Sequence, residues 1–155
     1  MRALNLLGDL WLWTIIVLAI ALLLALRHRR AAALLVVLTL VGDLAGFGLK
    51  LLVGRSRPEG IAIEHLLGGD SFAFPSGHVV RITALGAALV WALAPPRYRL
   101  AAALAVGALG GLLMGYGRVA LGVHWPTDVA GGLLLGLAWF ALTAWLVWHP
   151  VPQSR

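Results

Sequence analysis

Residues 74–78 of the chain, FPSGH, stand at the start of a long apolar run. The other charged and polar motifs of the sequence can be related to this stretch. Pro75 has no backbone N–H and Ser76 is a favourable helix N-cap, so a helix is predicted to begin at Gly77. A glycine there also lets a ligand approach the backbone closely. The N–H groups of a first helical turn bind anions, and His78 stands on that turn.

The composition predicts an integral membrane protein. Of the 155 residues, 61% are hydrophobic and only 12% are charged, which is about half the usual charged share. The chain offers several apolar runs of the roughly 20 residues that cross a bilayer. We expect residues 1–155 to form a single domain. The net charge of +6 is better explained by basic loops against anionic lipid headgroups than by binding of nucleic acid.

Hydropathy along the chain predicts an all-α, polytopic transmembrane helix bundle. About five spans are expected, and these are Leu10–Leu26, Ala31–Leu49, Gly77–Leu93, Leu100–Tyr116 and Pro126–Trp148. Met1–Asp9 would lie in the membrane interface, Lys50 would end the second span, and residues 118–125 would form a loop.

Basic residues suggest the orientation of these spans. Arg27–Arg30 and Pro95–Arg99 are basic turns, which the positive-inside rule places in the cytoplasm. The long polar segment 51–74 and the helix start at Gly77 would then lie on the outer side. This places the site at the outer interface of the cell (inner) membrane, facing the periplasm or the exterior.

Two further groups of charged residues fall on the same outer side. Lys50 and Arg57 are seven positions apart, and Arg118, His124 and Asp128 follow one another at intervals of six and four. Charged groups near membrane depth are costly and indicate a function. Three cations against one carboxylate favour a phosphate over a metal ion.

Asp128 lies four residues after His124, where a carboxylate can orient an imidazole and raise the basicity of its other nitrogen. The plain alternative is an interfacial pair that caps a helix. The rival chemistry is a metal site, which would draw on His78, His124, Asp128, Glu64 and His65. We favour the phosphate because metal sites are normally built from anionic or neutral ligands.

Taken together, these motifs resemble the three-part signature of the type 2 phosphatidic acid phosphatase superfamily. The parts are Lys50 through Arg57-Pro58, then Pro75-Ser76-Gly77-His78, then Arg118 through His124 to Asp128. The resemblance covers nearly the whole chain and departs from the family pattern twice. Gly117 stands where the family usually has serine, and five spans are expected where membrane members usually have six.

The resemblance implies a metal-independent lipid phosphatase without a cofactor. His124 would be the nucleophile that forms a phosphohistidine, Asp128 would orient it, and His78 would protonate the leaving oxygen and later activate water. The phosphoryl oxygens would be held by Lys50, Arg57, Ser76, Gly77 and Arg118.

The substrate would be a phosphate monoester or diphosphate of a long-chain lipid held in the bilayer. Polyprenyl diphosphates, phosphatidylglycerol phosphate and phosphatidate are all compatible with the sequence. Two alternatives stay open: a lipid phosphotransferase that uses the same phosphohistidine, and a catalytically silent lipid-binding membrane protein.

Arg81 is a further candidate site residue because it lies three positions after His78, on the same helix face. It would contact a second phosphate of the substrate or pair with Asp43, which the pattern predicts to form an ion pair inside the bundle.

Overall fold

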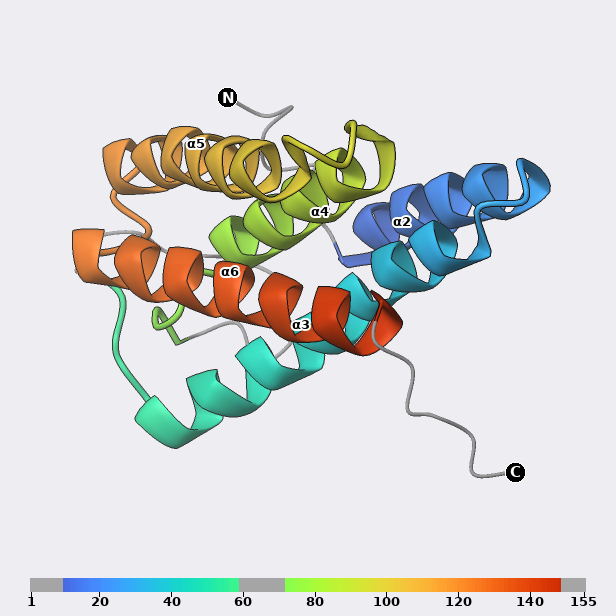
Figure 1. Ribbon diagram of the computed structural model, residues 1–155. Coiled ribbons are helices and arrows are strands. Elements are labelled where there is room, and N and C mark those ends of the chain that lie inside the picture. The colour runs from blue at the N-terminus through green and yellow to red at the C-terminus, as the bar shows by residue number, and fades with distance from the viewer. Residues whose placement is uncertain (1–9, 59–71, 149–155) are drawn as a thin grey trace.

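The computed structural model describes residues 10–58 and 72–148, and within these ranges it contains helices and no strand. The helices are α2 (Leu10–Leu26), α3 (Arg30–Val53), α4 (Gly77–Leu93), α5 (Arg99–Ala120) and α6 (Pro126–Trp148), shown in Figure 1. The predicted all-α helix bundle is confirmed. The prediction for Met1–Asp9 falls outside the described residues, as do Glu64 and His65.

All five helices are apolar, and α3, α5 and α6, with 24, 22 and 23 residues, are long and apolar enough to cross a membrane. The helices α2 and α4 have 17 residues each, which is at the short end of the range for a spanning helix. Large apolar side chains are exposed on the outside of the bundle, as on Leu44, Leu113 and Leu134. Such a surface suits a hydrocarbon environment.

Three of the described helices have the bounds of the predicted spans, and α3 and α5 do not. The prediction that Lys50 ends the second span is wrong: α3 continues to Val53. Gly54 ends the helix by adopting a left-handed conformation with φ 59°, and its N–H donates to the Lys50 carbonyl. The prediction that Arg118 begins a loop is also wrong, because Arg118 lies in the last turn of α5.

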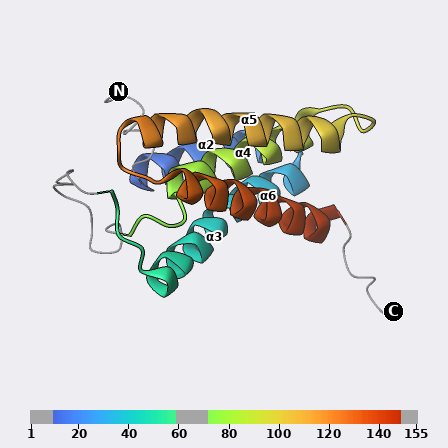
Figure 2. The ribbon, with the colours of Figure 1, turned by 90° about the vertical axis from the view of Figure 1, so that its left-hand side faces the viewer.

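The central helix of the bundle is α4, which packs against α3, α5 and α6. Figure 1 and the turned view in Figure 2 both place α5 and α3 on opposite sides, with α4 and α6 between them. The remaining helix, α2, packs mainly against α3. This arrangement surrounds the start of α4 with the ends of its neighbours.

Glycines allow α5 and α6 to approach α4 closely. A Cβ atom at Gly107 of α5 would come within 2.8 Å of the Thr83 carbonyl oxygen, and one at Gly132 of α6 within 2.9 Å of the Ser76 carbonyl oxygen. Small residues at such contacts are typical of packing between membrane helices. The contact at Gly132 fixes the start of α6 against the start of α4, where the candidate site lies.

Candidate active site

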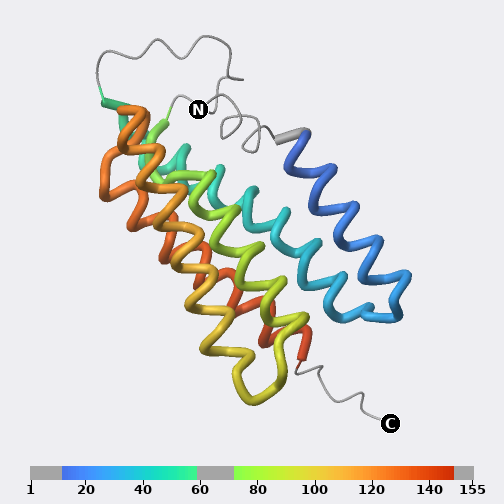
Figure 3. Tube along the Cα trace, turned by 90° about the horizontal axis from the view of Figure 1, so that it is seen from above, coloured from blue at the N-terminus to red at the C-terminus, as the bar shows by residue number. Residues whose placement is uncertain are grey.

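The three sequence motifs come together at one end of the bundle. Figure 3 shows that the C-terminal ends of α3 and α5 and the N-terminal ends of α4 and α6 meet there. The backbone joins these segments directly: the Ser76 N–H donates to the Asp128 carbonyl at 3.0 Å, and the Ala73 N–H donates to the Arg55 carbonyl at 2.8 Å. The motif residues are therefore neighbours in space although they are far apart in the sequence.

His124 and Asp128 form a buried pair. Asp128 is fully buried in the first turn of α6, and His124, in the preceding loop, is 3% exposed. The carboxylate oxygen Oδ2 lies 3.4 Å from His124 Nδ1 and accepts a hydrogen bond from the Trp125 N–H at 2.8 Å. A carboxylate at Nδ1 favours the proton on that nitrogen and leaves a lone pair on Nε2.

The other imidazole nitrogen faces a cation. Arg57 Nη1 lies 3.3 Å from His124 Nε2 and donates to the Val123 carbonyl at 2.9 Å. Burial is the main cause that lowers the pKa of His124, to about 2, and the charges of Arg57, Arg118, Lys50 and His78 add to it. With this shift the imidazole is neutral at neutral pH. A neutral His124 can act as a nucleophile through Nε2.

The predicted phosphate-binding cations are buried around this histidine. Lys50 is 6% exposed and donates from Nζ to the Phe72 carbonyl at 3.3 Å, and Arg118 is 8% exposed. The charges of Lys50, Arg118 and Arg57 all lower the pKa of His124, so all three side chains lie near its ring. Three cations at one imidazole create a positive environment that suits a phosphoryl group.

The start of α4 forms another wall of this environment. Ser76 is the N-cap residue, and its fully buried hydroxyl has no hydrogen-bond partner among the described residues. Gly77 begins the helix, and a Cβ atom there would meet no atom within 4 Å. His78 follows on the first turn and lies close enough to His124 to lower its pKa. The space beside Gly77 and the Ser76 hydroxyl are available to an anion.

Arg55 is a residue of this site that the sequence analysis did not select. Its Nη1 donates to Thr127 Oγ1 at 2.6 Å and to Asp128 Oδ1 at 3.0 Å, and its guanidinium lies 5.7 Å from the centre of the Trp125 ring. It thus holds the carboxylate oxygen that does not face His124. The only sequence signal for this contact is that a buried carboxylate needs partners for both oxygens.

Arg81 forms an ion pair with Asp43, with Arg81 Nε 2.9 Å from Asp43 Oδ1. Both side chains are largely buried, so the predicted ion pair inside the bundle is present. Contact of Arg81 with a second substrate phosphate stays a prediction. The rival metal site used Glu64 and His65, which lie outside the described residues; among the described residues, no group of three or more His, Cys, Asp or Glu side chains could hold a metal ion.

Residues 30–151 of this chain match the family model of the PAP2 superfamily. One similar protein is the lipid A 1-phosphatase of Rhizobium johnstonii, 38% identical in an alignment of 109 residues that covers 64% of this chain and 40% of that protein. Another is phosphatidylglycerophosphatase B of Bacillus subtilis, 33% identical over 61% of this chain and 47% of the relative. The undecaprenyl-diphosphatase of Sulfolobus acidocaldarius is 28% identical over 71% of this chain and 52% of the relative.

The chain thus spans about half or less of the length of these curated relatives. It is also similar to the crystal structure of a transmembrane PAP2-type phosphatidylglycerolphosphate phosphatase from Bacillus subtilis, with a TM-score of 0.71 and 26% identity over 99% of this chain and 77% of that one. The long apolar helices and this transmembrane relative identify the chain as an integral membrane protein. The family match over residues 30–151, together with the fold, shows that the chain belongs to the PAP2 superfamily.

Proposed function

We propose that this chain is a metal-independent lipid phosphatase that works through a phosphohistidine on His124. The observation that carries the proposal is the environment of the His124 imidazole. Asp128 Oδ2 lies beside Nδ1, and Arg57 Nη1 lies 3.3 Å from Nε2. A neutral imidazole with an oriented lone pair and a cation beside it is suited to attack a phosphorus atom whose oxygens are held by cations.

The proposed reaction has two steps. In the first, the His124 Nε2 lone pair forms a bond to phosphorus while the bond from phosphorus to the lipid oxygen breaks, and His78 gives its proton to that oxygen. In the second, His78 takes a proton from water, the water oxygen bonds to phosphorus, and the P–N bond breaks to release phosphate. Asp128 stabilises the positive imidazole ring that exists between the two steps.

The proposed phosphate-binding residues are Lys50, Arg57, Ser76, Gly77 and Arg118. Phosphoryl transfer depends above all on positioning and on neutralising the charge of the equatorial oxygens. Three cations and the first turn of α4 provide this without a divalent ion, so we infer a reaction that needs no metal and no cofactor.

We infer that the substrate is a phosphate monoester or diphosphate of a long-chain lipid. The relatives are named as phosphatases of lipid A, phosphatidylglycerol phosphate and undecaprenyl diphosphate. The site lies at the end of apolar helices, where a lipid headgroup would be placed while its chains stay in the bilayer.

We also propose that the site faces outward from the cell (inner) membrane. Arg29 Nη1 donates to the Ala92 carbonyl at 2.9 Å, so the basic turns before α3 and after α4 lie side by side at the bundle end opposite the site. The positive-inside rule favours the cytoplasm for that end.

The test is phosphate release by the purified chain in detergent from phosphatidate, phosphatidylglycerol phosphate, a polyprenyl diphosphate and lipid A. Residues 1–155, acting as one phosphatase domain, should hydrolyse at least one of these lipids, and His124→Ala should not. An alcohol acceptor included in a parallel reaction separates hydrolysis from transfer. If the chain binds these lipids but releases phosphate from none of them, it is a catalytically silent lipid-binding protein and the proposed function is wrong.

A further inference from the structure

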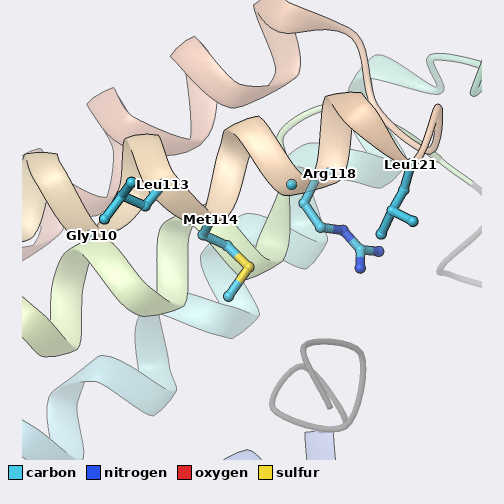
Figure 4. A pocket seen from close by; sticks show the side chains of 6 residues that line it. Gly110, Leu113, Met114, Arg118 and Leu121 are labelled. Carbon is cyan, nitrogen blue, oxygen red and sulfur yellow. The ribbon is translucent and has the colours of Figure 1, made fainter. Parts of the chain in front are cut away.

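A shallow groove runs along one face of α5 and ends at the candidate active site. It encloses about 210 Å³ and is lined by Gly110, Leu113, Met114, Gly117, Arg118 and Leu121. Figure 4 shows Leu113, Met114 and Arg118 along the same stretch of α5, with the Arg118 guanidinium beside the Leu121 side chain. We propose that this groove binds the part of the lipid hydrocarbon chain next to the phosphate, an inference that rests on the proposed phosphatase function.

Gly117 leaves open space in the groove, because a Cβ atom there would meet no atom within 4 Å. Gly110 instead lets α5 pack closely against α4, since a Cβ atom there would lie 3.1 Å from Ile82 Cγ2. Leu113, between them, is 67% exposed on the outer surface of the bundle. The groove therefore opens sideways toward the lipid phase, and a substrate chain can enter it without leaving the bilayer.

Arg118 connects the groove to the phosphate-binding residues. Its side chain lines the groove, and its charge lowers the pKa of His124, which places it near the proposed nucleophile. The other lining residues are apolar or glycine. A cation at one position and an apolar wall along the rest match a phosphate ester joined to a hydrocarbon chain.

The size of the groove favours a short segment of chain over a whole ligand. Pockets that enclose a complete small molecule have volumes of roughly 300–1,000 Å³. At about 210 Å³, this groove can hold only the carbons closest to the phosphate. The rest of the chain would remain in the bilayer.

The chain contains no cysteine, so single cysteines can test the groove without background labelling. We would introduce Leu113→Cys in the groove and, as a matched control, Leu134→Cys on α6, where the leucine is 71% exposed and Leu113 is 67% exposed. Reaction with N-ethylmaleimide is followed in detergent, alone, with hexadecylphosphonate or with methylphosphonate. Both phosphonates resist hydrolysis, and only the first carries a long chain.

Hexadecylphosphonate at about ten times its dissociation constant leaves about a tenth of the sites empty, so labelling of the Leu113→Cys variant should slow about tenfold. Methylphosphonate should leave it unchanged, and the Leu134→Cys variant should respond to neither. If the wild-type chain hydrolyses lipid but hexadecylphosphonate protects both variants equally, or protects neither, the groove does not bind the hydrocarbon chain. Absence of any hydrolysis by the wild-type chain would instead reject the phosphatase function.

A second variant fills the groove. Gly117→Leu should lower kcat/KM for a long-chain lipid phosphate about tenfold, because its side chain would occupy the space proposed for the hydrocarbon chain. Hydrolysis of p-nitrophenyl phosphate, which has no chain, should change little. Gly48→Leu on α3, where a Cβ also meets no atom within 4 Å, is the control. Equal losses on both substrates would count against the groove.

Discussion

Replacing Arg55 by methionine tests whether Asp128 must be held from both sides. Arg55 donates to Asp128 Oδ1 at 3.0 Å, while the other carboxylate oxygen faces the Trp125 N–H and His124. Arg55→Met removes this donor and the positive charge but keeps a long apolar side chain that can still lie on the Trp125 ring. The carboxylate would then be free to turn away from His124.

The expected size of the effect follows from the exposure of the pair. A hydrogen bond to a charged group contributes about 1.5–3 kcal/mol. Asp128 is fully buried, but the Arg55 side chain is 38% exposed, so we take the lower end. A loss of about 1.5 kcal/mol in the transition state lowers kcat about tenfold.

The assay is hydrolysis of p-nitrophenyl phosphate at pH 7, with kcat and KM determined separately. Arg55→Lys keeps the charge and a donor and should lose less of kcat than Arg55→Met. Arg97→Met, which removes a cation that stacks on Tyr98 at the opposite end of the bundle, should behave like the wild-type chain. A raised KM with unchanged kcat would show that Arg55 binds substrate and does not position Asp128.

Four further predictions concern metal, topology, Arg81 and acid stability. Activity should survive EDTA and gain nothing from divalent cations, since the cations of the site are side chains; loss on chelation that one metal restores would favour the metal site. An impermeant thiol reagent should label Gly69→Cys from outside intact cells and should not label Tyr98→Cys; the reverse would place the site in the cytoplasm. Arg81→Ala should lower diphosphate hydrolysis more than monophosphate hydrolysis if Arg81 meets a second phosphate, whereas equal losses would leave it as the partner of Asp43. Because burial lowers the pKa of His124, the unfolded chain takes up a proton below about pH 6.5 that the folded chain does not, so the thermal midpoint should fall from pH 7 to pH 5. His124→Gln should reduce this fall, and an identical fall in both proteins would contradict the low pKa.

The helices were predictable from the sequence because apolar length alone determines a membrane span. The ends of α3 and α5 were less predictable. Lys50 and Arg118 are charged and suggested helix ends, yet both lie within the last turn of a helix, because Gly54 ends α3 and α5 continues to Ala120. A charged side chain at the end of a membrane helix can take part in a polar site without interrupting the helix.

Contacts of the candidate site were predictable where both residues belong to the same sequence motif, and not where they come from distant segments. Asp128 lies in the first turn of α6, four residues after His124, so their contact follows from local geometry. The contact between Arg55 and Asp128 joins residues that are 73 positions apart and depends on how α3 and α6 pack. Arg81 and Asp43 could be proposed as partners because each is a charged residue within a predicted span, and their ion pair is present.

The most direct test of the central claim is to trap the phosphoenzyme. The wild-type chain, mixed with a ³²P-labelled lipid phosphate and quenched rapidly, should carry label that is stable in base and lost in acid, as expected for a P–N bond. His124→Ala should carry none, and His78→Ala should still become labelled from an aryl phosphate, whose leaving group needs little protonation. Label on His124→Ala, or label that survives acid and is lost in base, would contradict a phosphohistidine at His124.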